Sequence, residues 1–337
     1  TYKPTVDIYG PITNKIAYRV NGAFETAESF RDIVESKKHY FNPSFLFNIG
    51  EKSQLIVEAD YLKNDFTPDF GIGSITNYDG SYQENPFLSR DAFVGTDWQY
   101  QNVQQATTGI TFNTQLSEFW TLNSVASYQN YTKDYFSTER IQWSYDAANR
   151  LSWNRPLNRT YSEQNYTSLQ ININGQINTG SVKHKILVGT DGDYGTNDSY
   201  TYLNPTNGKT YGTSYLYGTN GNSTGTIYLD DASSWASGAM PESVRKERNR
   251  IPTQRFGIFA QDFIELTDKF KVLAGLRWSY IENLESERVN FTDGKITNGT
   301  GTVDRAFSPK AGLIYTPNDH LSVFATYTNS FSANTGE

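Results

Sequence analysis

The sequence predicts an all-β protein: a transmembrane, antiparallel, up-and-down β-barrel to which this chain contributes about 12 strands. Three observations predict this fold. Apolar and polar residues alternate along many segments, as they do in strands, whose successive side chains point to opposite faces. Short turns and long polar connections follow one another in strict alternation. Aromatic residues make up 15% of the 337 residues, although only 36% are hydrophobic, and Tyr or Trp often ends an apolar face.

The alternating segments recur along the whole chain, and each opposes its apolar residues to Asn, Gln, Thr, Ser or charged residues. In chain order the apolar sets are Ile16, Tyr18, Val20 and Phe24; Leu55, Val57, Ala59 and Tyr61; Ile110, Phe112 and Leu116; Trp120, Leu122, Ala126 and Tyr128; Leu169, Ile171, Ile173 and Ile177; Val272, Ala274, Leu276, Trp278 and Tyr280; and Leu321, Val323, Ala325 and Tyr327. We expect these sets to face lipid and the polar sets to face the lumen of the barrel, because hydrocarbon cannot satisfy polar groups.

The connections give the barrel its orientation. Six short turns, rich in the residues that supply turn geometry, are expected at Pro11–Asn14, Ile49–Lys52, Leu116–Glu118, Asn178–Ser181, Leu266–Lys269 and Thr316–Asp319. The five longer connections between them are expected at 27–38, 66–101, 132–162, 192–252 and 283–303. Outer-membrane barrels show this asymmetry, with short periplasmic turns and long extracellular loops. A soluble sandwich also alternates but has no reason to place every long loop at one end.

Composition excludes several classes of function. The net charge of −7 argues against a nucleic-acid-binding protein, which normally carries a basic face. The absence of Cys excludes disulfides, iron–sulfur clusters and thiol catalysis. The sequence contains no run of about 18 apolar residues, so it predicts no transmembrane helix. A mean hydropathy of −0.62 is compatible with a transmembrane barrel, whose strands are apolar on one face only.

Three stretches resemble the TonB-dependent siderophore receptors of Gram-negative outer membranes, and they occur in the order found in that family. They are "VDIYGPITNKIAYRVNGAFETAESFRD", "GIFAQDFIELTDKFKVLAGLRW" and "FSPKAGLIYTPNDHLSVFATYTNSFSANTG". The resemblance implies a barrel of roughly 22 strands with a plugged lumen. It also implies active import of a ferric siderophore, energised by TonB–ExbB–ExbD from the periplasm. Residues 1–337 are expected to be an internal part of that one barrel domain, without the plug, the TonB-contacting region or the closing strands.

The long connections are unusually aromatic, and this composition suggests a ligand-binding mouth. Tyr and Trp offer large rigid surfaces together with a hydrogen-bonding group. The candidate ligand-binding residues are Trp98, Tyr100, Trp143, Tyr145, Trp153, Tyr217 and Trp235. The alternative is that these side chains pack the loops against one another and anchor them at the membrane interface. Iron is expected to arrive as cargo held by the siderophore, so no protein metal ligand and no cofactor is predicted.

Two further stretches carry charge. "DGDYGTND" (Asp191–Asp198) resembles a calcium-binding loop but lacks the ligand spacing of an EF-hand, so a solvated loop start is expected. "ESVRKERNR" (Glu242–Arg250) is expected to be a solvated face, with lipopolysaccharide or an anionic ligand as the alternative partner. The three histidines, His39, His184 and His320, form no catalytic or metal-binding motif. No catalytic residue is therefore predicted, and a hydrolase is disfavoured.

The preferred function is a TonB-dependent receptor that imports a ferric siderophore and contacts outer-membrane lipid and lipopolysaccharide. A TonB-dependent importer of another solute, such as cobalamin or an oligosaccharide, is the nearest alternative. A passive porin would have an open polar lumen and no plug. An adhesin or lectin-like β protein would account for aromatic loops but not for the alternation of short and long connections.

Overall fold

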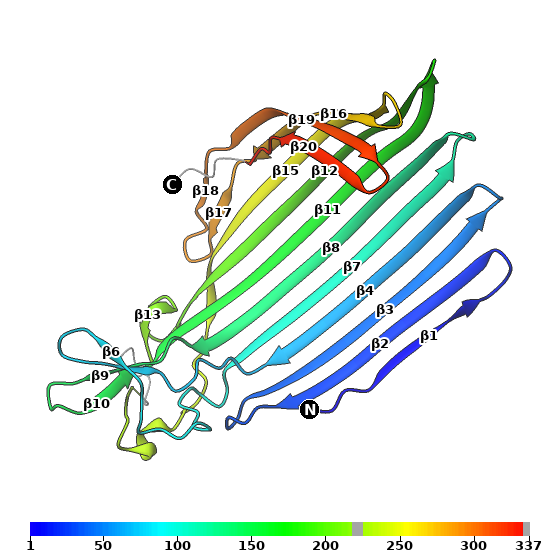
Figure 1. The fold of residues 1–337 in the computed structure, drawn as a ribbon. Helices are drawn as coiled ribbons and strands as arrows, with labels where there is room; N and C mark the ends of the chain where they lie inside the picture. Colours follow the sequence, from blue (N-terminus) through cyan, green and yellow to red (C-terminus); the bar gives the residue numbers. More distant parts are fainter. Residues whose placement is uncertain (218–224, 333–337) are drawn as a thin grey trace.

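One large curved antiparallel sheet dominates the computed structural model, which describes residues 1–217 and 225–332 (Figure 1). Residues 218–224 of the fourth predicted connection, and residues 333–336 of the third family-like stretch, lie outside the described residues. Within the described residues, no helix is long and apolar enough to cross a membrane.

Twelve long strands follow one another across this sheet in the order of the chain. They are β1 (Thr5–Pro11), β2 (Ile16–Glu28), β3 (Glu35–Ile49), β4 (Ser53–Phe66), β7 (Tyr100–Gln115), β8 (Trp120–Thr138), β11 (Pro156–Thr179), β12 (Val182–Leu203), β15 (Val244–Glu265), β16 (Phe270–Asn283), β19 (Thr302–Asn318) and β20 (Leu321–Thr328). Every neighbouring pair is antiparallel. The predicted all-β, up-and-down architecture with about 12 strands is confirmed.

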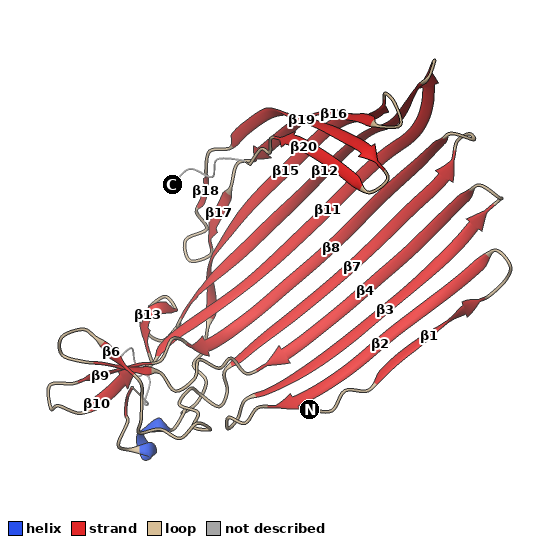
Figure 2. Cartoon of the chain, in the orientation of Figure 1, coloured by secondary structure: helices blue, strands red, loops and turns tan. Residues whose placement is uncertain are grey.

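Smaller elements lie at the end of the sheet where the long connections are, with the strands drawn in red and the one short helix in blue (Figure 2). β13 (Gly212–Leu216) pairs with β11, β17 (Glu287–Asn290) pairs with β15, and β18 (Ile296–Asn298) pairs with β17. A separate five-stranded sheet consists of β14 (Thr226–Tyr228), β10 (Leu151–Asn154), β9 (Gln142–Tyr145), β5 (Ser74–Thr76) and β6 (Tyr82–Gln83). A 3-10 helix, η1 (Ala232–Trp235), follows β14.

The register places the predicted apolar sets on one face of the large sheet. Leu276 lies opposite Ala260 and Pro309, and Ala260 lies opposite Val188. Leu276 is 50% exposed, and large apolar side chains on this face of other strands are exposed as well. Examples are Phe45, Ile110, Leu169, Val188, Ile258, Leu313 and Val323. An apolar face of this extent would be unfavourable in water, so the sheet is built to face hydrocarbon.

Aromatic side chains border the apolar face at both ends of the strands. Toward the long connections they include Phe24, Phe41, Tyr61, Tyr128, Tyr194, Phe256 and Phe307, all of which are exposed. Toward the short turns, Phe270 stacks on Tyr315 with 4.5 Å between the ring centroids. On β16 the apolar face therefore runs from Phe270 to Tyr280, a length that fits the roughly 9–11 residues a tilted strand needs to cross a bilayer. Such aromatic rows mark the two membrane interfaces of outer-membrane barrels.

The strands extend further toward the long connections than the sequence predicted. β8 continues to Thr138 and β11 begins at Pro156, so 132–138 and 156–162 are strand. Likewise, 192–203 belongs to β12 and 244–252 to β15. The expected connection 66–101 shortens to 67–99, 283–303 to 284–301 and 27–38 to 29–34. Beyond the aromatic row the regular alternation of apolar and polar residues ends, while the backbone pairing of these strands continues.

Two predictions about charged stretches change because the strands are longer than expected. Asp191–Asp198 lies inside β12 and is paired with β11 on one side and β15 on the other, so the expectation of a solvated loop start was wrong. The part of the "ESVRKERNR" run from Val244 onward belongs to β15 rather than to a loop. There, Arg250 is paired with Asp198 at 2.6 Å, and Arg248 is paired with Glu287.

Candidate ligand-binding site

Three of the long connections fold together into one body. The β4–β7 connection supplies β5 and β6, the β8–β11 connection supplies β9 and β10, and the β12–β15 connection supplies β14 and η1. β5 and β9 pair in parallel, with Ser74 opposite Gln142 and Thr76 opposite Ser144. β10 pairs with both β9 and β14. We call the five-stranded sheet together with η1 the loop unit; it lies beyond the ends of the barrel strands (Figure 1).

The loop unit has a hydrophobic core of its own. Its buried residues are Ile75, Val94, Ile141, Trp143, Trp153, Ile227 and Leu229, and Leu88, Tyr145, Leu151 and Trp235 pack against them. Trp143 is 0% exposed, and its indole Nε1 donates a hydrogen bond to the carbonyl of Ile72 at 2.8 Å. Because the core draws residues from all three connections, none of the three can bury its apolar side chains alone.

A second aromatic cluster lies between the loop unit and the barrel strands. Its buried members are Phe136, Leu157, Tyr202, Tyr211, Tyr215 and Tyr217, with Trp98, Tyr100, Tyr161 and Tyr200 packed against them. Phe136 follows Tyr128 by an even number of residues in an unbroken ladder, so both point to the apolar face of β8. Tyr100 lies opposite Phe136 and points the same way. This cluster therefore continues the lipid-side face beyond the aromatic row instead of lining the polar side.

A buried arginine joins the loop unit to the barrel. Arg155, between β10 and β11, is 0% exposed. Its Nη1 donates to the carbonyl of Ala236 at 3.3 Å, and its Nη2 donates to the carbonyl of Trp235. Its own carbonyl accepts a hydrogen bond from the backbone N–H of Tyr217 at 2.5 Å. Burial lowers the pKa of Arg155 to about 10, so the side chain stays charged at neutral pH.

The structure places the seven predicted binding residues in these two cores. Trp143, Trp153 and Tyr217 are buried, and their ring faces are covered by neighbouring side chains. Tyr145 and Trp235 are partly buried against the loop-unit core, and Trp98 and Tyr100 are partly buried against the second cluster. The alternative of loop packing thus describes their positions in this chain, while contact with a ligand stays a prediction for all seven.

Other aromatic side chains of the same loops are free to meet a ligand. Tyr78, Tyr82 and Phe87 are 74%, 67% and 67% exposed. Tyr78 stacks on Tyr145 with 4.8 Å between the centroids, which leaves its other face open. Sequence reasoning did not select these three, because composition alone does not separate an aromatic that packs a loop from one that projects from it.

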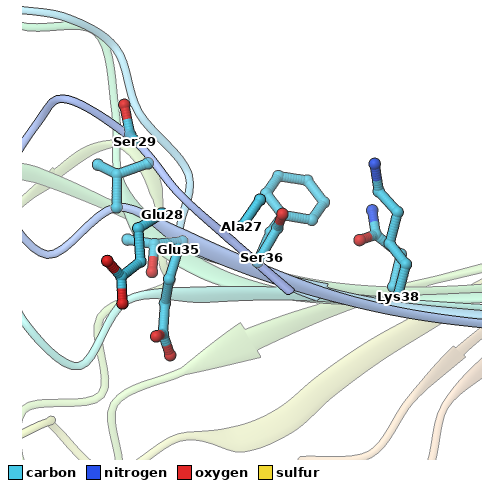
Figure 3. Close-up of a pocket in the computed structure, with 10 residues that line it drawn as sticks. Ala27, Glu28, Ser29, Glu35, Ser36 and Lys38 are labelled. Atoms are coloured by element: carbon cyan, nitrogen blue, oxygen red, sulfur yellow. The ribbon is translucent and has the colours of Figure 1, made fainter. Parts of the chain in front are cut away.

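A hollow of about 360 Å³ lies at the rim of β2, β3 and β4, beside the short β2–β3 connection. Figure 3 shows Ser36 and Lys38 on one side of the ribbon, with Glu28 and Glu35 on the other. Lys38 lies opposite Asn64 in the ladder, on the polar face, and its Nζ is paired with Glu25 at 3.3 Å. The side-chain oxygen of Asn64 is buried without a partner. The rim therefore offers polar groups toward the inside of the sheet.

An exposed apolar sheet face bordered by aromatic rows, with short turns at one end and folded loops at the other, defines a transmembrane β-barrel of the receptor type. The chain belongs to the TonB dependent receptor-like, beta-barrel family, whose model matches residues 40–337. This family is one of receptors, in agreement with the prediction that the chain is not an enzyme.

The curated relatives are named as receptors for metal-pseudopaline or for siderophores. The chain is 25% identical over 344 residues to the metal-pseudopaline receptor CntO of Pseudomonas aeruginosa, covering 99% of this chain and 44% of that protein. It is 24% identical to the catecholate siderophore receptor Fiu of Escherichia coli, covering 97% and 45%. The chain thus spans less than half the length of these relatives.

Solved structures of similar proteins share the fold. The open form of Fiu from E. coli superposes with a TM-score of 0.74 at 20% identity, covering 97% of this chain and 52% of that one. The siderophore receptor PiuA from Acinetobacter baumannii superposes with a TM-score of 0.76 at 19% identity, covering 97% and 47%. The predicted resemblance and the barrel fold are confirmed.

Proposed function

We propose that this chain forms a central part of the barrel of a TonB-dependent receptor that imports a ferric siderophore across the outer membrane of a Gram-negative bacterium. The observation that carries the proposal is the folded loop unit at one end of a lipid-facing sheet. Three long connections that share one aromatic core form a rigid scaffold at the extracellular mouth. Membership of the receptor family and the names of the relatives agree with it.

The proposal assigns roles outside the described residues. Residues 1–337 would supply internal strands of a roughly 22-stranded barrel, and a plug would fill its lumen. TonB–ExbB–ExbD would act on a segment N-terminal to this chain. The lipid-facing residues would contact outer-membrane lipid, and the charged positions beyond the aromatic row would meet lipopolysaccharide. The iron would remain bound to the siderophore, so no protein cofactor is needed.

A second cargo is favoured by one observation. The relative matched over 99% of this chain is named a metal-pseudopaline receptor, so a metal complex of another small chelator is an alternative to a ferric siderophore. Both cargoes are metal chelates and would enter by the same route. A panel of ferric siderophores and of chelates of divalent transition metals separates the two.

Ligand capture is tested by tryptophan quenching of the complete receptor with ferric siderophores. We expect alanine at Tyr78, Tyr82 or Phe87 to weaken binding by about tenfold each, because these exposed rings can stack on the ligand. Alanine at Trp98, Tyr100, Trp143, Tyr145, Trp153, Tyr217 or Trp235 is predicted to weaken binding as well, by direct contact or by loosening the loops. The proposal fails if the wild-type receptor binds no metal chelate in the panel.

A further inference from the structure

A hollow of about 490 Å³ lies on the inner face of the sheet, lined by residues of β11, β12, β15, β16, β19 and β20. Figure 1 shows how the later strands of this group curl. Apolar residues such as Leu187 and Phe259 line it together with polar ones, which include Gln170, Asp191, Gln261, Arg277, Ser308 and Lys310. Lys310 lies opposite Gly275, next to the lipid-facing Leu276. The hollow therefore lies at the level of the membrane-spanning strands, away from the loop unit, on the face of the sheet opposite to lipid.

A fixed arginine forms one side of this hollow. Arg277 donates from Nη1 and Nη2 to the two carboxylate oxygens of Asp191, at 2.6 and 2.7 Å, and from Nε to Ser279 at 2.9 Å. Its side chain is 37% exposed on the inner face of the sheet. A bidentate pair of this kind holds the guanidinium plane in one orientation.

Glycines make the space in which these side chains sit. A Cβ on Gly257 would lie 2.1 Å from Nη2 of Arg277, and a Cβ on Gly189 would lie 2.4 Å from the ring of Phe259. Both distances are too short for real contacts, so neither position accepts a larger residue unless Arg277 or Phe259 moves. The wall is thus shaped around Arg277 and Phe259, and Cζ of Arg277 lies 5.6 Å from the centroid of the Phe259 ring.

The charges of the hollow do not balance. Arg277 and Lys310 are cationic, and Asp191 neutralises one of them. Lys310 is exposed and forms no ion pair among the described residues; its Nζ reaches only Oε1 of Gln261, at 3.5 Å. Inside a barrel whose outer face is hydrocarbon, an unbalanced cation attracts anions more strongly than it would at an open surface.

We infer that this hollow binds an anionic oxygen group, such as a carboxylate, of the imported chelate during its passage through the lumen. The ammonium of Lys310 and the exposed edge of the Arg277 guanidinium supply charge-assisted hydrogen bonds. The ring of Phe259 supplies an apolar face beside them. The inference rests on the proposed import function, but it concerns a site separate from the extracellular mouth.

Single-cysteine chemistry tests the charge of the hollow, because residues 1–337 contain no cysteine. Any cysteine elsewhere in the complete receptor is first replaced by serine. In the complete receptor, Ser308→Cys is reacted with an anionic and a cationic methanethiosulfonate. Thr111→Cys is the control, since it lies on the same polar face in β7. We expect the ratio of anionic to cationic rates to be about tenfold higher at position 308 than at 111, and to fall to the control value when Lys310→Gln is added. Equal ratios at both positions would overturn the inference.

The occupant is identified by protection of the same cysteine. Saturating ferric siderophore that the wild-type receptor binds should slow modification of Ser308→Cys in cells with active TonB but not in cells without TonB. If the cysteine at position 308 is already unreactive when no ligand is present, a segment that fills the lumen covers the hollow. That result would overturn passage of the cargo through it. A wild-type receptor that binds no chelate would contradict the import function itself, whatever the rate ratio shows.

Discussion

Neighbouring residues on one strand experience different solvents in this protein. Leu276 projects from the apolar face, whereas Arg277 is paired with Asp191 on the opposite face. We predict that Leu276→Arg destabilises the complete receptor by about 2–4 kcal/mol, because a cation near the bilayer midplane cannot be solvated. Urea unfolding in lipid vesicles measures this, with Thr111→Arg on the polar face of β7 as the control. Spin labels at 276 and 277 should show the first to be the more lipid-accessible; the reverse order would contradict the register.

Also at the scale of single residues, Arg155 supplies hydrogen bonds to backbone carbonyls at the loop unit. Its guanidinium satisfies the carbonyls of Trp235 and Ala236. We predict that Arg155→Ala lowers the local stability around η1 by about 1–3 kcal/mol, because it leaves buried carbonyls without donors. Hydrogen exchange should accelerate in 228–238 and stay unchanged in β19. Arg140→Ala, at an exposed position of the same connection, is the control and should leave exchange at wild-type rates.

At the scale of elements, the loop unit connects three segments that are far apart in the sequence. Trp143 lies in β9, and its neighbours come from the β4–β7 and β12–β15 connections. We predict that Trp143→Ala removes exchange protection from β5, β10 and β14 together, because a buried Trp→Ala change costs about 3–5 kcal/mol. The exposed Phe87→Ala is the matched control. If only 139–155 lost protection, the three connections would be independent loops.

At the scale of the whole molecule, short turns and folded loops lie at opposite ends of the sheet (Figure 1). We predict that an epitope tag at Tyr78 is reached by antibody on intact cells expressing the complete receptor. A tag at Thr267, in the turn between β15 and β16, should be reached only after permeabilisation. Labelling of the Thr267 tag on intact cells would mean that the barrel is inserted the other way round.

The sequence by itself determined the strands that cross the membrane and the face that each apolar set occupies. Leu55 to Tyr61 and Val272 to Tyr280 show the period of two because hydrocarbon on one side and water on the other impose it. Each of the six expected turns overlaps a break between consecutive strands, since Gly, Pro, Asn and Asp act locally. The family-like stretches lie in these same hairpins, so the class of protein was also accessible from the sequence.

Only the tertiary structure decided what happens beyond the aromatic row. Asp191–Asp198 is strand because its neighbours pair with it, and no apolar period announces that pairing. Trp143 is buried and Tyr78 is exposed because three connections meet in one core, a contact between residues distant in the chain. The same holds for the hollow around Arg277 and Lys310, which residues of six strands line together. Local alternation depends on solvent at each strand, whereas burial and charge balance depend on which strands and loops the fold brings together.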